Sequence, residues 1–133
     1  MATFQLDIVT PEKTIYSGDV EHVQAPGADG GFGVLARHQP MLAALAIGQV
    51  VFTQADGTNH KLAVSGGFAN VSGDGMTVLA ETAEMAQEID IERARVARDR
   101  ARSRLSDRGQ VDMDRAQAAL SRATWRLRTC GAE

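Results

Sequence analysis

Residues 88–105 read EIDIERARVARDRARSRL, and this stretch divides the chain into two parts with different patterns. From Asp90 to Leu105 it contains neither Gly nor Pro and is dominated by Ala and Arg, two good helix formers. Apolar residues recur there at steps of three and four residues, the spacing that gathers them on one helix face. The stretch therefore predicts an amphipathic helix.

A second helical segment follows a predicted break at residues 106–109. Asp112 is its predicted N-cap, and Met113, Ala116, Ala123 and Leu127 form its apolar stripe. Two helices of about four turns joined by a short loop are expected to fold back antiparallel. Because both stripes are rich in alanine, they bury little area, and the hairpin is predicted to be loosely held.

Before residue 81 the chain has the pattern of short strands separated by turns. Phe4, Leu6 and Ile8 alternate with polar residues, as in a half-buried strand. Further strand segments are predicted at residues 20–25, 46–53, 61–65, 68–72 and 76–80, with a glycine-rich turn at residues 27–33. Such spacing favours an antiparallel sandwich or flattened barrel. The predicted fold class is mainly β plus α, with an N-terminal antiparallel β-sandwich at residues 1–84 and a C-terminal antiparallel two-helix hairpin at residues 85–133.

Charge separates the same two parts of the chain, although the formal net charge is only −3. Residues 1–80 carry three basic and seven acidic side chains, whereas residues 92–128 carry eleven arginines against five acids. An arginine-rich helix can be a solvated face, a nucleic-acid contact or a pocket for a smaller anion. Nucleic acid is disfavoured, because the strand-rich part is acidic and the helices contain no lysine and one aromatic residue, Trp125.

The sequence offers no arrangement of residues typical of an active site or a metal site. His22, His38 and His60 fall in separate predicted segments without metal-ligand spacing. The Ser65-Gly66-Gly67 stretch lacks the pattern of a hydrolase nucleophile elbow. No apolar run approaches the roughly 20 residues that span a bilayer. We therefore expect a chain that is not an enzyme, binds no metal and reaches a membrane only through another protein.

Three segments resemble the epsilon subunit of bacterial and chloroplast F-type ATP synthase. They are LDIVTPEKTIYSGDVEHVQAPGADGGFGVLARHQPMLAAL (6–45), VSGGFANVSGDGMTVLAETA (64–83) and EIDIERARVARDRARSRL (88–105). The resemblance implies a sandwich of about ten strands followed by two helices. It also implies a non-catalytic rotor subunit of the central stalk of a proton-translocating synthase, peripheral at the cytoplasmic face of the bacterial plasma membrane.

The same resemblance implies the partners of each part of the chain. The sandwich would bind the gamma subunit and the c-ring, and the hairpin would lie beside it or extend along gamma to the catalytic head, where it blocks ATP hydrolysis. No nucleic-acid partner and no required cofactor are implied. The chain departs from the family where Ala36-Arg37 replaces Pro-Gly and where Gly31 replaces a glutamate of the glycine-rich loop.

Some members of the family bind ATP on the folded hairpin through the motif I/L-D-x-x-R-A, which is similar to Ile89-Asp90-Ile91-Glu92-Arg93-Ala94 here. The resemblance extends the ATP-binding set to Glu84, Arg100, Arg122 and Arg126. Arg93 and Arg100 are two turns apart on one helix face, and Arg122 and Arg126 are one turn apart. In an antiparallel hairpin these four guanidinium groups can converge on one triphosphate, which they bind bidentately. The other arginines, Arg95, Arg98, Arg102, Arg104 and Arg108, are interpreted as a solvated face.

Two alternatives to an ATP-responsive rotor subunit remain open from the sequence. One is a purely structural rotor subunit whose hairpin does not respond to nucleotide. The other is a free module that binds nucleic acid or another anion through the arginine-rich helix.

Overall fold

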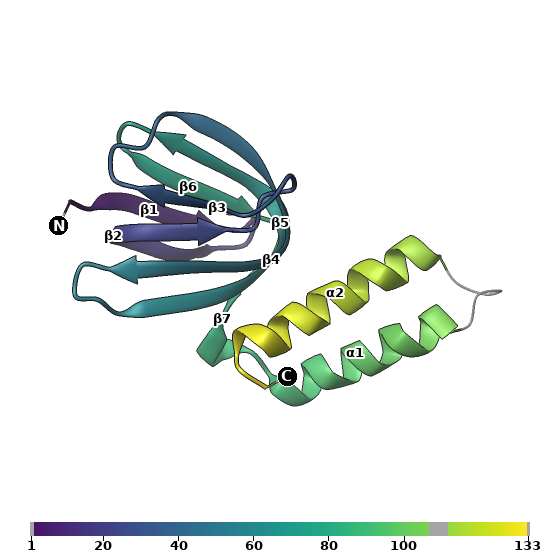
Figure 1. The fold of residues 1–133 in the computed structure, drawn as a ribbon. Helices are drawn as coiled ribbons and strands as arrows, with labels where there is room; N and C mark the ends of the chain where they lie inside the picture. The colour runs from purple at the N-terminus through teal and green to yellow at the C-terminus, as the bar shows by residue number, and fades with distance from the viewer. Residues whose placement is uncertain (1, 107–111, 133) are drawn as a thin grey trace.

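The computed structural model describes residues 2–106 and 112–132. It consists of a strand-rich N-terminal part and two C-terminal helices that lie side by side and run antiparallel (Figure 1). The strands are β1 (Phe4–Val9), β2 (Thr14–Ala25), β3 (Phe32–Leu35), β4 (Met41–Gln54), β5 (Asn59–Ser72), β6 (Gly75–Ala80) and β7 (Ala83–Met85). The helices are the 3₁₀ turn η1 (Ala86–Glu88), α1 (Ile91–Ser106) and α2 (Met113–Thr129). The predicted break at residues 106–109 falls largely outside the described residues.

The strands close on themselves into a flattened barrel. The sheet order is β1-β6-β5-β4-β2-β3, and β1 also pairs with β2, which closes the ring; β7 pairs with β5. The fold class predicted from the sequence, mainly β followed by a helical hairpin, is confirmed. One pairing differs from the expected antiparallel pattern, since β1 and β6 run parallel from Gln5 opposite Gly75 to Val9 opposite Leu79.

The described residues form seven continuous strands where the resemblance implied about ten. The difference arises because β4 and β5, each of 14 residues, run through the corners of the barrel without interruption. β5 turns its corner at Gly66 and Gly67, which have φ angles of +86° and +119°. A side chain at Gly67 would bring its Cβ to 2.0 Å from the carbonyl oxygen of Leu79, so the corner requires glycine there.

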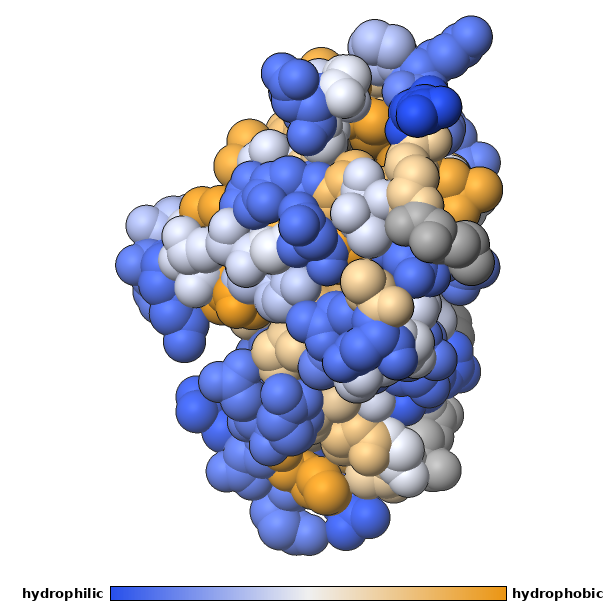
Figure 2. Space-filling view, turned by 90° about the vertical axis from the view of Figure 1, so that its left-hand side faces the viewer, coloured by the Kyte–Doolittle hydropathy of each residue, from blue (hydrophilic) through white to orange (hydrophobic). Residues whose placement is uncertain are grey.

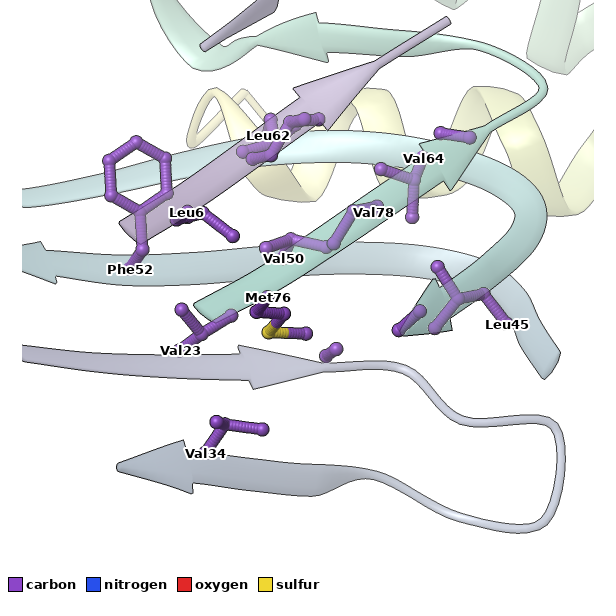
Figure 3. Close-up of a cluster of buried hydrophobic side chains, with 14 of the residues drawn as sticks. Leu6, Val23, Val34, Leu45, Val50, Phe52, Leu62, Val64, Met76 and Val78 are labelled. Atoms are coloured by element: carbon purple, nitrogen blue, oxygen red, sulfur yellow. The ribbon is translucent and has the colours of Figure 1, made fainter. Parts of the chain in front are cut away.

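One apolar core fills the barrel. Leu6 and Ile8, predicted to face inward, are fully buried, and Phe52, Leu62 and Val78 meet them from three other strands. Figure 3 shows Leu6, Phe52, Leu62 and Val78 in this cluster of buried side chains. Residues 32 and 33, expected to belong to the glycine-rich turn, instead begin the strand β3, which pairs with β2, and Val34 of β3 joins the core.

The hairpin is joined along an alanine seam, as the sequence predicts. Ala94 and Ala101 of α1 and Ala116 and Ala123 of α2 are each no more than 5% exposed. Asp112 caps α2, because its Oδ1 accepts the backbone N–H of Arg115 at 3.1 Å. The seam lets the two backbones approach closely but contains little side-chain area to bury.

The hairpin meets the barrel mainly through the C-terminal end of α2, which packs against β4 and β5. Leu127 is fully buried there, and Thr129 Oγ1 donates a 3.2 Å hydrogen bond to Oε1 of Gln49 on β4. Trp125 lines a cavity of about 400 Å³ between α2 and strands β2 to β4. The end of α1 and the start of α2 point away from the barrel in Figure 1. The contact between the two parts is therefore confined to a few residues.

Candidate functional site

A cavity lies where β7, η1, the start of α1 and the end of α2 meet. Its volume is about 220 Å³, and it is lined by Glu84, Glu88, Asp90, Arg93, Ala94 and Arg126. The strand β7 leads from the sheet through η1 directly into α1, which brings the start of α1 next to the end of α2 (Figure 1). Five of the eight residues predicted to bind ATP line this one cavity: Glu84, Asp90, Arg93, Ala94 and Arg126.

Asp90 has a structural role that the motif alone did not reveal. Its Oδ1 accepts the backbone N–H of Arg93 at 3.1 Å, and its carbonyl oxygen accepts the N–H of Ala94 at 3.0 Å. Asp90 is thus the N-cap of α1, the position at which an acidic side chain satisfies a free N–H and complements the helix dipole. The cap fixes the first turn of α1, and the exposed Arg93 side chain is presented to the cavity from that turn.

Arg126 reaches the cavity from α2 and is held by a carboxylate of the barrel. Its Nε lies 2.5 Å from Oε1 of Glu84, and the two side chains are 32% and 35% exposed. Glu84 is positioned by β7, where it pairs with Ala63 of β5. This ion pair joins residues that are 42 positions apart and connects the barrel to the hairpin.

The three remaining predicted residues lie at or beyond the edge of the cavity. Arg122 is half-buried and lines a smaller neighbouring cavity together with Glu84 and Arg126. Ile89 is 8% exposed and packs in the link between η1 and α1. Arg100 is exposed on α1 and is not among the residues that line either cavity. The structure therefore brings Arg93, Arg122 and Arg126 to one region and leaves Arg100 apart from it.

Glu88 lines the cavity but was not predicted from the sequence. It lies in η1, two residues before Asp90, and is exposed. The one feature of the sequence that could have indicated Glu88 as a cavity residue is its position just before the I-D-x-x-R-A motif. This indication is weak, because η1 has no apolar periodicity. With Glu88 included, three carboxylates and two guanidinium groups line the cavity. Such a lining can bind phosphate through Arg93 and Arg126 and hydrogen-bond donors of a ligand through its carboxylates.

Within residues 2–106 and 112–132, no group of three or more His, Cys, Asp or Glu side chains is arranged to hold a metal ion. Among the helices of the same residues, none is both long and apolar enough to cross a membrane. Of the arginines interpreted as a solvated face, Arg95, Arg102 and Arg104 are exposed, whereas the Arg98 side chain is only 21% exposed and pairs with Asp99. Arg95 pairs with Glu92 within α1. Arg108 lies outside the described residues.

Two protein-family models match the chain one after the other. The model described as ATP synthase, delta/epsilon chain, beta-sandwich domain matches residues 3–86. The model for the long alpha-helix domain of the same chain matches residues 87–131. The chain belongs to the ATP synthase delta/epsilon chain family. The resemblance found in the sequence is confirmed.

Curated members of the delta/epsilon family are similar over nearly the whole chain. The ATP synthase epsilon chain of Nitratidesulfovibrio vulgaris is 53% identical over 130 residues, which cover 97% of this chain and 96% of the relative. The ATP synthase epsilon chain of Desulforamulus reducens is 46% identical over 127 residues, covering 95% and 96%. These relatives are named for a non-catalytic subunit, so the expectation of an accessory subunit that is not itself an enzyme is confirmed.

Solved structures share the fold of this delta/epsilon family member. A chain in the cryo-EM structure of the Euglena gracilis mitochondrial ATP synthase superimposes with a TM-score of 0.72 at 23% identity, covering 99% of this chain and 79% of that one. A chain of the Tetrahymena thermophila mitochondrial ATP synthase, from its central stalk and c-ring, gives 0.62 at 11% identity, covering 97% of each. At these identities the likeness concerns the fold.

Proposed function

We propose that the chain is a rotor subunit of the central stalk of a proton-translocating ATP synthase, peripheral at the cytoplasmic face of the bacterial plasma membrane. Its barrel couples the gamma subunit to the c-ring, and its hairpin regulates ATP hydrolysis in response to ATP. Membership of the delta/epsilon family supports the first part, together with structural neighbours taken from assemblies that contain F1, the central stalk or the c-ring. The second part rests on the cavity at the base of the hairpin.

An exposed apolar face of the barrel supports the contact with gamma. Leu42, Phe68 and Leu79 are 72%, 54% and 52% exposed. Phe68 lies directly opposite Leu79 across β5 and β6, and Leu42 lies diagonally from Phe68 across β4 and β5. Three large apolar side chains grouped on one sheet face mark a surface for a protein partner. The face shown in Figure 2 carries hydrophobic patches separated by hydrophilic residues.

The glycine-rich turn supports the contact with the c-ring. Residues 28–31 are exposed at the end of β2, where a turn can touch a partner without rearrangement of the barrel. Asp29 is the acidic side chain in this turn, because Gly31 stands where the family carries a glutamate. The contact we propose therefore relies on Asp29 for its charge.

The cavity at the base of the hairpin carries the proposal of ATP binding. Arg93 on α1 and Arg126 on α2 line it together, with Arg122 next to it. Guanidinium groups from both helices can therefore reach the same phosphates only while the hairpin is folded. A ligand that binds the folded hairpin alone stabilises it by mass action. ATP would hold the hairpin folded, and its loss would release the hairpin toward the catalytic head.

The packing of the hairpin suits a switch of this kind. The alanine seam buries little area, and the contact with the barrel is confined to the end of α2. The folded and the extended hairpin then differ in free energy by only a few kcal/mol, a difference that the binding of a ligand can overcome. A hairpin held by a large leucine-rich interface would not respond to ligand binding of ordinary strength.

Isothermal titration calorimetry of the full chain with ATP and with ADP tests this function. We expect saturable binding of ATP by the wild type and its loss in Arg93→Ala. Arg102→Ala is the matched control, because Arg102 is exposed on the same helix but lines neither cavity. If the wild type produces no binding heat with ATP, the regulatory part of the proposal fails, and a purely structural rotor subunit is left.

A further inference from the structure

A cavity between α2 and the barrel shares no lining residue with the candidate ATP cavity. Its volume is about 400 Å³. Trp125 forms its wall on α2, and residues of β2, β3, β4 and the glycine-rich turn form its wall on the barrel. Cavities that bind small molecules measure about 300–1,000 Å³, so this cavity has the size of a ligand site.

The barrel wall is fixed in place by the packing of the turn against β4. The carbonyl oxygen of Pro26 accepts the N–H of Ala46 at 2.8 Å. Pro26 also lies against Gly48, where an added Cβ would come within 2.7 Å of the Pro26 Cβ. Gly31 places no side chain in the cavity, and a Cβ there would meet the carbonyl oxygen of Ala25 at 3.7 Å, an ordinary contact. A wall formed in advance lowers the entropy cost of binding a ligand.

The helix wall is positioned by the docking of α2. The Arg128 guanidinium carbon lies 5.1 Å from the centroid of the Trp125 ring, a cation–π contact that restricts the orientation of the ring. Leu127 is fully buried between these two residues in the sequence. Gln49 also lines the cavity, and its Oε1 accepts the hydroxyl of Thr129 at 3.2 Å, which orients its amide.

The lining indicates the chemical class of the ligand. None of the described residues that line the cavity carries an ionisable side chain, and a charge buried there without a partner would be costly. Trp125 and Phe32 supply an aromatic ring from each part of the chain, against which a flat ring can stack. The side-chain amides of Gln24 and Gln49 can each donate and accept hydrogen bonds. These groups suit an uncharged aromatic molecule with polar groups on its rim.

We propose that this cavity is a binding site for an uncharged, flat aromatic molecule that carries a carboxamide or a similar hydrogen-bonding group, and that the ligand bridges the barrel and the hairpin. Because one wall belongs to α2, the complete cavity exists only while α2 is docked. The ligand therefore stabilises the docked hairpin by mass action. The site is separate from the proposed ATP site and does not depend on ATP binding.

The test is an NMR titration of the isotope-labelled full chain with quinoline-3-carboxamide. Quinoline-3-carboxylate is the matched probe, because it has the same ring and replaces the uncharged amide by a charge. Half-saturation by the carboxamide is expected at about 1 mM or below, the affinity of a ligand with about 13 non-hydrogen atoms. The expected shifts are those of the Trp125 indole N–H, the single tryptophan signal, and of the Gln24 and Gln49 side-chain amides.

Two variants test whether the probe occupies this cavity. Gly31→Leu adds a side chain to the wall and should weaken binding of the carboxamide at least about tenfold. Gly73→Leu is the matched control, because an added Cβ there meets open space in the turn after β5 and outside the cavity. Neither glycine has a positive φ, so both substitutions fit the backbone. Gln24→Ala, at an exposed position of β2, removes one amide and should weaken binding about two- to tenfold.

Bridging is measured in the same samples from hydrogen exchange of the backbone amides at the docked end of α2. With the probe at ten times its Kd, exchange of the Leu127 and Thr129 amides should slow about tenfold, the factor given by mass action. Unchanged exchange at that concentration would show that the ligand does not bridge the two parts.

The expected result is saturable binding of the carboxamide, weakened by Gly31→Leu and Gln24→Ala and kept within about twofold by Gly73→Leu. No saturation by the wild type up to about 10 mM, or equal weakening by Gly31→Leu and Gly73→Leu, overturns the site. A carboxylate that binds as tightly as the carboxamide overturns the assignment of an uncharged ligand.

Discussion

Thr129 Oγ1 donates a 3.2 Å hydrogen bond to Oε1 of Gln49 and so joins the last turn of α2 to β4 across 80 residues of sequence. Thr129 is 4% exposed, and neighbouring Leu127 is fully buried. The bond lies on the same short stretch of α2 as Arg126. Among the described residues, the docking of the hairpin involves the buried Leu127 and the polar contacts of Thr129 and Arg126 with the barrel.

Replacing Thr129 by Val keeps the side-chain shape and removes the donor. We expect the free energy of unfolding to fall by about 1 kcal/mol, the net value of one hydrogen bond. Urea unfolding followed by Trp125 emission measures the change, because Trp125 lies one turn before Thr129 on α2. Thr124→Val, at a half-buried position of the same helix, is the control. Equal effects of the two substitutions would contradict a specific role for the bond.

The cap at Asp90 gives a prediction that separates structure from ligand binding. Asp90→Asn retains an acceptor for the N–H of Arg93, whereas Asp90→Ala loses it. We expect Asp90→Ala to cost about 1 kcal/mol of stability and Asp90→Asn to cost only a few tenths. Thermal unfolding by circular dichroism measures both. If calorimetry shows that Asp90→Asn binds ATP like the wild type, the carboxylate acts as a cap alone, and its place among the nucleotide ligands is contradicted.

The alanine seam predicts that enlarging one of its members forces the helices apart. Ala101 is 2% exposed at the helix interface and lies outside the cavity. Ala101→Leu should therefore lower stability by about 1–3 kcal/mol through overpacking and weaken ATP binding without touching a ligand residue. Ala97→Leu, at a half-buried position on the same helix, should have a smaller effect on both measurements. Unchanged unfolding of Ala101→Leu would show that the seam is not tightly packed.

Arg37 has a backbone conformation that favours glycine, with φ at 64°. The resemblance implies a glycine at this position, since Ala36-Arg37 stands where the family commonly carries Pro-Gly. Non-glycine residues pay about 1–2 kcal/mol in the left-handed region. We expect Arg37→Gly to raise the free energy of unfolding by about 0.5–1 kcal/mol, since glycine also loses more entropy on folding. Denaturant unfolding measures the change, and a fall in stability would contradict strain at this turn.

The parts of the fold that depend on local patterns were predictable from the sequence. The alternation of Phe4, Leu6 and Ile8 predicted β1, and the three- and four-residue spacing of alanines predicted both helices and their seam. Asp112 was recognisable as an N-cap, because capping needs only a short polar side chain next to the first turn.

The parts that depend on tertiary contacts were not predictable. The strand β7 has three residues, too few for a period, and it exists because β5 offers a free edge for pairing. The parallel pairing of β1 with β6 joins segments about 70 residues apart in sequence, and no local pattern indicates it. The sequence likewise identified Glu84 and Arg126 only by resemblance, and their mutual contact required the position of α2 against the barrel.

ATP hydrolysis by the synthase assembled with this chain tests most directly whether the hairpin is a regulator. The measurement compares complexes that carry the full chain with complexes that carry a chain lacking residues 88–133, at low and at high ATP. Retention of the shortened chain is verified by its co-purification with the complex. We expect faster hydrolysis without the hairpin at low ATP, and a difference that shrinks as ATP rises. Equal activity at every ATP concentration would contradict it and leave a purely structural rotor subunit.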